Sequence, residues 1–190
     1  MTARITPAQP PFAPEIQSWL DRTMPRGRPP LVLFTTLARD TRLFNRFFAA
    51  GLLDRGHLTL RQRELVIDRI TALCGSEYEW GVHVAFFGER IGLDQHQLES
   101  LVSGRPEDSC WHDEERVLLR LCDALHRDCA VSDELWADLR GRFPEEAILE
   151  LLMLAGFYTM VSYVTNGLRL PSEPYARRFP AAAVPPSAGT

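Results

Sequence analysis

Apolar residues recur every three to four positions through the middle of this sequence. No segment shows the strict alternation of apolar and polar residues that is typical of a β-strand. The three-to-four spacing places the apolar side chains of each segment on one face of an α-helix. We therefore predict an all-α fold, with helices over residues 15–24, 31–38, 41–53, 59–74, 77–91, 94–102, 112–129, 132–140 and 145–168.

Proline placement marks the ends of the helical region, because proline breaks helix interiors. Seven of the fourteen prolines lie between residues 7 and 30, and five lie between residues 171 and 186. The last predicted helix, 145–168, is apolar on nearly every face, which predicts a central position or a subunit interface. We divide the chain into an extended N-terminal arm with one short helix (1–30), a single helical domain (31–171) and an extended or disordered C-terminal tail (172–190).

Composition and charge exclude several classes of function. The net charge of −4 and the absence of a basic run argue against nucleic-acid binding. All 21 basic residues are arginine, so Schiff-base chemistry on lysine and a phosphate-binding P-loop are excluded. No apolar run approaches the roughly 20 residues of a membrane span, and no secretory signal is visible. We therefore predict a cytoplasmic protein that contacts neither nucleic acid nor a membrane and keeps its four cysteines reduced.

The concentrated chemistry of the sequence lies where two predicted helices meet. Gly75 suits the left-handed residue that ends the first helix, and Ser76 suits the N-cap of the second. Glu79 and His83 lie four positions apart on the second helix, so their side chains point the same way. If the two helices pack side by side, Glu64 of the first helix faces Ser76, Glu79 and His83 of the second. We predict a catalytic group made of Glu64, Ser76, Glu79 and His83.

Each member of this group also has a purely structural interpretation. Ser76 and Glu79 match the S-x-x-E pattern of a capping box, in which the carboxylate folds back onto the helix end. His83 suits a core histidine satisfied by Glu79, and Glu64 suits the positive end of its helix dipole. A metal held by Glu64, Glu79 and His83 is disfavoured, because their spacing differs from the Glu-x-x-His pattern of di-iron bundles. We predict neither a metal nor a cofactor.

Further residues are candidates for the wall of a substrate pocket. Asp68 lies four positions after Glu64 on the first helix, so both face the same side. Trp80 lies three positions before His83 on the second helix and shares its face. Tyr158 and Ser162 are polar groups four positions apart on the last helix, within an apolar stretch. The phenylalanines between residues 34 and 48 are predicted to belong to the core instead.

The residues around this group resemble the carboxymuconolactone decarboxylase family, whose other branch is the AhpD-like alkylhydroperoxidases. The resemblance is carried by Arg63-Glu64-Leu-Val-Ile, by Gly75-Ser-Glu-Tyr-Glu-Trp80 with His83, and by the closing helix 157–171, where the family often carries an asparagine such as Asn166. It implies an AhpD-like helical fold, a homotrimer or a homohexamer, and a substrate-binding role for Asn166.

In the peroxidase branch a C-x-x-C motif carries the thiol chemistry, and Ser76 and Glu79 stand at the cysteine positions here. Neither side chain can attack a peroxide or resolve a sulfenic acid, which argues against AhpD-like peroxidase (peroxiredoxin) activity. The resemblance instead implies a lyase-type, cofactor-free acid/base enzyme that decarboxylates or isomerises a small carbonyl or lactone substrate. Two alternatives stay open: a thiol peroxidase that uses Cys74, and a non-catalytic oligomeric protein that binds a small molecule.

Overall fold

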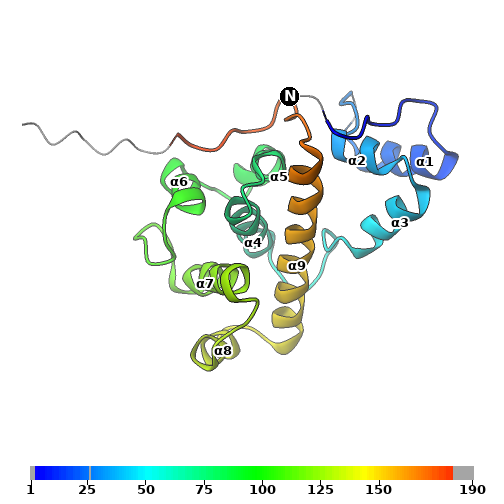
Figure 1. Ribbon diagram of the computed structural model, residues 1–190. Coiled ribbons are helices and arrows are strands. Elements are labelled where there is room, and N and C mark those ends of the chain that lie inside the picture. Colours follow the sequence, from blue (N-terminus) through cyan, green and yellow to red (C-terminus); the bar gives the residue numbers. More distant parts are fainter. Residues whose placement is uncertain (1–2, 26, 182–190) are drawn as a thin grey trace, which may run out of the picture.

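The computed structural model describes residues 3–25 and 27–181 of the chain. Within these residues the regular secondary structure is entirely helical, which confirms the prediction of an all-α fold. The elements are α1 (Pro14–Thr23), α2 (Val32–Leu37), α3 (Thr41–Ala50), α4 (Leu60–Leu73), α5 (Glu77–His83), the π-helical turn η1 (Val84–Gly88), α6 (Gln95–Ser103), α7 (Asp113–Asp128), α8 (Asp133–Arg140) and α9 (Glu145–Leu168). Figure 1 shows α9 running between the N-terminal helices α1 to α3 and the group formed by α4 to α8.

The core of the fold is built around α4, because this helix is buried along most of its length. Every residue from Glu64 to Thr71 is buried. The helix packs against α5, α6, α7 and α9. The main apolar cluster joins Val66 and Ile67 of α4 to Leu118 of α7 and Leu151 of α9. The polar residues of α4 are therefore held inside the protein, where their interactions are strong.

Local sequence sets both ends of α4. The Thr59 N–H donates to Gln62 Oε1 at 2.8 Å and the Gln62 N–H donates to Thr59 Oγ1 at 3.2 Å, which is a capping box. After the helix, Gly75 has a φ of +62°, a left-handed conformation that glycine adopts without steric cost. The chain therefore reverses in a tight turn, and α5 packs back against α4.

The helix predicted over 77–91 is not regular along its length. The α-helical part, α5, ends at His83, and η1 follows over Val84–Gly88. A π-helical turn holds extra residues per turn and is frequent at functional sites. The prediction of one continuous α-helix is therefore wrong, because the hydrogen-bonding pattern changes directly after the histidine.

The N-terminal helices form a small cluster of their own. Ile16 and Leu20 of α1 are buried together with Phe44 of α3. Trp19 of α1 also stacks on Phe48 of α3, with ring centroids 3.6 Å apart. The short helix predicted within residues 1–30 is thus α1, and aromatic packing fixes it on α3.

The chain after α9 lies along α5 as an extended segment over residues 171–181 (Figure 1). Within it, the buried carboxylate of Glu173 accepts hydrogen bonds from the Tyr78 hydroxyl at 2.5 Å and from the Val32 N–H at 2.6 Å. This segment therefore ties α5 to the start of α2. It is the described part of the predicted tail 172–190, whose remaining residues lie outside the described ones.

Among the described residues, α9 is the one helix that is long and apolar enough to cross a membrane by length and composition. The core helix of a soluble protein passes the same test, and the Leu151 and Leu154 face of α9 is buried in the main core, against α4. The central position predicted for this helix is therefore confirmed on that face. Its opposite face leaves several large apolar side chains exposed.

Candidate active site

Two of the four predicted catalytic residues, Glu79 and His83, line a cavity of about 330 Å³, whereas Glu64 and Ser76 do not line it. One wall is a face of α5, η1 and the residues after η1, with side chains that recur every three to four positions: Glu79, Val82, His83, Phe86, Phe87 and Arg90. The other walls come from α1 to α3 and from Phe157 and Tyr158 of α9. The N-terminal helices therefore cover the predicted site.

Aromatic side chains form much of the cavity wall. Trp19 comes from α1, Phe34 from α2, and Phe47 and Phe48 from α3. The phenylalanines between 34 and 48 were predicted to belong to the core. This holds for Phe44, which is 1% exposed, whereas Phe34, Phe47 and Phe48 also line the cavity. Periodicity indicates that a position faces inward, and it does not distinguish protein packing from the wall of a cavity.

A short hydrogen bond fixes the position of His83. Its Nδ1 lies 2.7 Å from Oε2 of Glu64, which is completely buried on α4. The other oxygen of Glu64 accepts from Nε and Nη2 of Arg63 at 3.0 and 2.9 Å. Both oxygens of Glu64 are therefore engaged, and the imidazole is held with its Nε2 available to the other carboxylate of the site.

Glu79 is less fully paired than Glu64. Its Oε1 lies 3.4 Å from His83 Nε2, an ion-pair distance that is long for a hydrogen bond. Its Oε2 is buried and has no hydrogen-bond partner among the described residues. Burial of an unpaired carboxylate oxygen is costly. Glu79 as a residue lines the cavity, so its incompletely paired carboxylate is the candidate group there to accept a proton or a hydrogen bond from a ligand.

The capping-box interpretation of Ser76 and Glu79 is wrong. Ser76 occupies the N-cap position of α5, but its side chain makes no cap hydrogen bond. Its hydroxyl instead lies 2.8 Å from the hydroxyl of Thr165 on α9, and Ser76 is completely buried. Ser76 thus joins two helices and does not line the cavity. The carboxylate of Glu79 is free of the helix end and faces His83.

Buried charges control the protonation of this site. Burial by itself lowers the pKa of His83, but the carboxylates of Glu64 and Glu79 outweigh it and raise the pKa from 6.5 to about 10. The imidazole is therefore cationic at neutral pH and carries a proton on both nitrogens. Burial, reinforced by Glu64, raises the pKa of Asp68 well above its usual value. Burial and the nearby carboxylates likewise raise the pKa of Tyr158, so its hydroxyl stays neutral.

Two predicted pocket residues on α4 and α5 lie away from the cavity. Asp68 is buried on α4, and its Oδ1 has no hydrogen-bond partner among the described residues. Trp80 is buried in a separate cluster with Val84 and packs on Phe179 at a centroid distance of 5.2 Å. Three positions along a helix leave about 60° between Trp80 and His83. That offset is enough to turn the indole toward the C-terminal segment.

Among the predicted α9 residues, Tyr158 lines the cavity and the others do not. The Ser162 hydroxyl donates to the Tyr158 carbonyl, one turn back, at 2.8 Å. The Asn166 side chain donates from Nδ2 to the carbonyl of Cys74 at 2.9 Å. Asn166 therefore holds the turn between α4 and α5. A helical face alone could not show this, because the partner lies far away in the sequence.

Cys74 lies at this turn in a setting that does not favour a reactive thiolate. Its Sγ is half-buried, lies 3.8 Å from His126 Nδ1 and does not line the cavity. Burial raises the pKa of the Cys74 thiol, and this outweighs the lowering by hydroxyl hydrogen bonds. A cysteine that attacks peroxide needs a lowered pKa. The geometry therefore gives no support to a peroxidase centred on this residue.

In the part of the chain that the structure describes, no three His, Cys, Asp or Glu side chains are arranged to hold a metal ion. The site around His83 illustrates the reason. Its Nδ1 faces Glu64 and its Nε2 faces Glu79, so both ring nitrogens already have carboxylate partners. The chemistry that this arrangement can perform is proton transfer and hydrogen bonding to a ligand.

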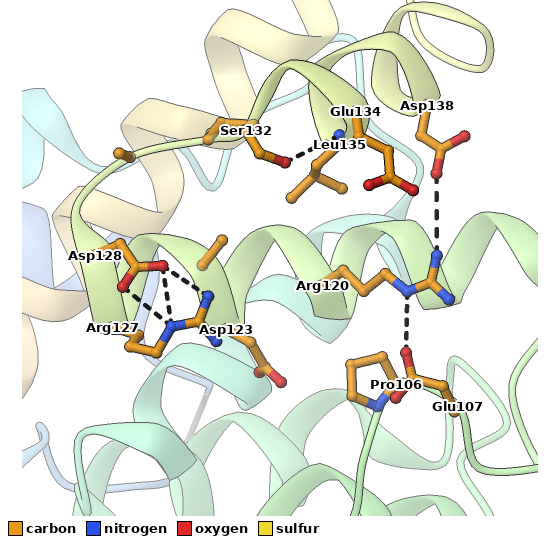
Figure 2. A pocket seen from close by; sticks show the side chains of 13 residues that line it. Pro106, Glu107, Arg120, Asp123, Arg127, Asp128, Ser132, Glu134, Leu135 and Asp138 are labelled. Atoms are coloured by element: carbon orange, nitrogen blue, oxygen red, sulfur yellow. Dashed lines mark hydrogen bonds and ion pairs between the residues drawn. The ribbon is translucent and has the colours of Figure 1, made fainter.

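A larger concave surface, about 690 Å³, lies between α7 and α8 (Figure 2). Its arginines are already paired: Arg120 lies 3.0 Å from Glu107 and 3.9 Å from Asp138, and Arg127 is paired with Asp128. These groups are largely exposed, and solvent screens such pairs. This groove is a solvated polar surface without an unsatisfied buried group, so the cavity at His83 is the better candidate site.

Sequence reasoning missed four cavity residues within the helix predicted over 77–91. They are Val82, Phe86, Phe87 and Arg90. The signal was present, because these positions continue the three-to-four spacing of Glu79 and His83. The aromatic residues of α1 to α3 had no comparable signal, since only the tertiary fold brings them to this cavity.

This chain resembles known proteins in sequence pattern and in fold. The pattern of the carboxymuconolactone decarboxylase family matches residues 41–119, which include Glu64, Glu79 and His83. An uncharacterized peroxidase-related protein from Silicibacter sp. TM1040 aligns with a TM-score of 0.78 and 21% identity, over 94% of this chain and 96% of that chain. A Ralstonia eutropha JMP134 protein, described as an alkylhydroperoxidase AhpD core and uncharacterized peroxidase-related protein, aligns with a TM-score of 0.75 and 19% identity, over 92% and 94% of the two chains.

A third similar structure is a variant of the debrominase Bmp8 in complex with 2,3,4-tribromopyrrole. It aligns with a TM-score of 0.73 and 15% identity, over 92% of this chain and 94% of that chain. At these identities the likeness shows the fold and carries no activity across. Comparison with curated proteins finds no match. The chain thus carries the pattern of the carboxymuconolactone decarboxylase family over residues 41–119, and it has the helical fold of these AhpD-like structures.

Proposed function

We propose that this chain is a cofactor-free acid/base enzyme that moves a proton at a carbon next to a carbonyl group. The observation that carries the proposal is the pairing of two unlike groups at the cavity. Glu79 has a buried carboxylate oxygen without a partner, and beside it His83 is held as an imidazolium by Glu64. A base and a cationic hydrogen-bond donor side by side are the groups that enolate chemistry requires.

Each residue has a separate task in this scheme. Glu79 takes the proton from the carbon next to the carbonyl, and the electron pair of that C–H bond moves to the carbonyl oxygen to form an enolate. The Nε2–H of His83 donates to that oxygen and stabilises its negative charge. Glu64, itself fixed by Arg63, keeps the imidazole protonated and oriented. Return of the proton to a different carbon gives an isomerised product.

Decarboxylation uses the same groups with a different bond broken. When a carboxylate lies on the carbon next to the carbonyl, loss of CO₂ leaves the electron pair on the same enolate. The imidazolium of His83 again stabilises the oxygen, and Glu79, which has first taken a proton from water, then supplies that proton to carbon. The finer choice between lyase and isomerase therefore depends on the substrate and on whether Glu79 meets it protonated or ionised.

The cavity favours a small, largely apolar ring as the substrate. Its volume of about 330 Å³ lies at the lower end of the range for small-molecule sites. Aromatic side chains from five elements surround it, and its charged groups are Glu79, His83 and Arg90. A lactone or cyclic ketone would place its ring among the aromatic side chains and its carbonyl at the polar end.

Proton exchange tests the first step without knowledge of the final product. Unsaturated lactones and cyclic ketones, with and without a carboxylate, would be incubated with the protein in D₂O and followed by proton NMR. We expect protein-dependent loss of the signal from the C–H next to the carbonyl, and a rate at least about 100-fold lower in Glu79→Gln. Cys74→Ser, which lies outside the cavity, serves as the matched control and should keep the wild-type rate.

The other outcomes contradict the proposal in distinct ways. If proton exchange survives in both Glu79→Gln and His83→Gln, neither residue takes part in the proton transfer. Ligands that bind in the cavity without any exchange would identify a binding protein. Loss of activity in Cys74→Ser, together with peroxide consumption by the wild type, would restore the thiol peroxidase.

A further inference from the structure

Tyr158 carries a hydroxyl group on the part of the cavity wall that contacts His83. Its ring stands at 89° to the imidazole, with the two ring centroids 5.0 Å apart. The residue lies on the buried face of α9 and is 2% exposed. Its ring also packs on Phe157, at a centroid distance of 5.5 Å. The tyrosine is therefore held by packing beside the pair of residues that moves the proton.

The hydroxyl of Tyr158 has no hydrogen-bond partner among the described residues. The other buried tyrosine, Tyr78, is satisfied, because its hydroxyl donates to Glu173 at 2.5 Å and accepts from the Leu33 N–H at 3.0 Å. A buried hydroxyl without a partner is costly. The Tyr158 oxygen is not sealed inside the protein, as Oε2 of Glu79 is, and Tyr158 lines the cavity. A ligand in the cavity is therefore the partner that this hydroxyl can find.

The hydroxyl of Tyr158 acts as a hydrogen-bond donor and not as a base. Burial raises the pKa of Tyr158 well above its usual value, and the carboxylates of Glu79 and Glu64 raise it further. The phenol therefore keeps its proton at neutral pH. In contrast to the imidazolium of His83, it can donate to a ligand without adding a charge to the site.

Tyr158 and His83 are placed to donate to the same small acceptor. Their rings are in contact, and both residues line one cavity. The Nδ1 of His83 is engaged by Glu64 at 2.7 Å, so Nε2 is the nitrogen that a ligand can use. Two fixed donors directed at one oxygen form an oxyanion hole, which stabilises the negative charge that develops on that oxygen during a reaction.

We propose that the hydroxyl of Tyr158 is a second donor to the substrate oxygen and forms an oxyanion hole together with the Nε2–H of His83. This inference rests on the proposed function, in which Glu79 removes a proton from carbon. The electron pair of the C–H bond moves to the carbonyl oxygen, while Tyr158 keeps its own proton. Its hydrogen bond to that oxygen strengthens as the negative charge grows. The site should therefore also bind phenolates, which carry the same charge on an oxygen attached to a planar ring.

Binding of 4-nitrophenol tests the donor pair without any turnover. Its phenolate absorbs visible light, so a titration reports both the affinity and the ionisation state of the bound molecule. Below the pKa of the free phenol, we expect the wild type to bind the phenolate. The wild type should bind 4-nitroanisole, which has the same ring but no ionisable oxygen, at least about tenfold more weakly.

Two tyrosine variants show which hydroxyl is responsible. Tyr158→Phe keeps the ring that packs on His83 and should bind the phenolate about tenfold more weakly, because one hydrogen bond to a charged oxygen is lost. Tyr175→Phe is the matched control. It also removes a hydroxyl without a hydrogen-bond partner among the described residues, but this hydroxyl lies outside the cavity. The control should keep the wild-type affinity.

Proton exchange in D₂O gives a second readout. At saturating substrate, Tyr158→Phe should exchange about 100-fold more slowly than the wild type. Its KM should change by less than about threefold, because the hydrogen bond strengthens only as the enolate forms. An unchanged Tm would show that the variant is folded.

The possible results separate the role of Tyr158 from the proposed function. Equal phenolate affinity in the wild type and in Tyr158→Phe would overturn the role of Tyr158 and leave the acid/base enzyme standing, as would an equal loss in Tyr175→Phe. Loss of phenolate affinity in Tyr158→Phe, with no exchange of any lactone or ketone by the wild type, would support the oxyanion hole and overturn the enzyme. A wild type that binds 4-nitroanisole as tightly as the phenolate would overturn the oxyanion hole even if Tyr158→Phe failed to fold.

Discussion

Replacing His83 with glutamine removes a proton-binding group whose pKa differs between the folded and the unfolded chain. In the folded chain burial lowers this pKa, but Glu64 and Glu79 raise it from 6.5 to about 10. The folded state therefore holds the proton more tightly. The stabilisation is fully present below about pH 6.5 and is lost as the pH rises through about 10. At 1.36 kcal/mol per pKa unit, the shift corresponds to roughly 5 kcal/mol.

Urea unfolding of the wild type and of His83→Gln, at several pH values from about 6.5 to about 9.5, measures this contribution. The difference between their free energies of unfolding should fall by about 1.4 kcal/mol for each pH unit. Titrating groups that do not interact with His83 are common to both proteins, so they cancel in the difference. The slope therefore reports the imidazole proton together with the groups coupled to it, of which Asp68 is one, and is independent of any fixed cost of the substitution.

A difference that stays constant over this pH range would refute the buried imidazolium. If the glutamine variant is too unstable to measure, the ring proton signals of His83 in the wild type answer the same question. A pKa near 10 predicts no inflection of these NMR signals between about pH 5 and 8, where an unperturbed histidine titrates. An inflection near 6.5 would show that Glu64 and Glu79 do not hold the proton in place.

Three further substitutions test other parts of the structure. Gly81→Ala should displace the 171–181 segment, because a Cβ there would collide with the carbonyl oxygen of Arg177. Trypsin should then cut after Arg177 at least about tenfold faster, and an unchanged digestion rate would contradict the packing of this segment against α5. Ser76→Ala should lower the free energy of unfolding by about 1 kcal/mol in urea titrations, because the hydroxyl loses its bond to Thr165. Glu79→Gln should shift the Tm by less than about 3 °C, because loss of its long ion pair with His83 is offset by removal of a buried carboxylate oxygen that has no hydrogen-bond partner among the described residues. A larger fall would make this carboxylate structural.

Features set by neighbouring residues could be predicted from the sequence. The left-handed turn at Gly75 depends on contacts within a few positions and occurs as expected. The capping box at Thr59 is likewise set by residues three positions apart. The role of Ser76 could not be predicted in the same way. Its partner Thr165 lies 89 positions away, and that contact stands in place of the local capping box which the S-x-x-E pattern allowed.

In the candidate site, too, contacts between residues close in the sequence could be predicted, and contacts made by the tertiary fold could not. Helical spacing correctly indicated that Glu79 and His83 point the same way, and they lie 3.4 Å apart at their closest polar atoms. Packing of α5 against α4 then brings Glu64 to His83, at 2.7 Å. The cover of the cavity could not be predicted, because residues such as Trp19 and Phe47 reach it only through the fold of α1 to α3.

The charges of the site suit the proposed abstraction of a proton from a neutral reactant. Arg63 and His83 carry two positive charges, and Glu64 and Glu79 carry two negative ones, so the buried group is neutral overall. Transfer of a proton from carbon to Glu79 moves one negative charge onto the substrate oxygen and leaves this balance unchanged. A cavity of low polarity permits such a step, because no new net charge is created inside it. The displaced charge arrives beside the Nε2–H of His83, which can bind the enolate oxygen in place of the carboxylate that has become neutral.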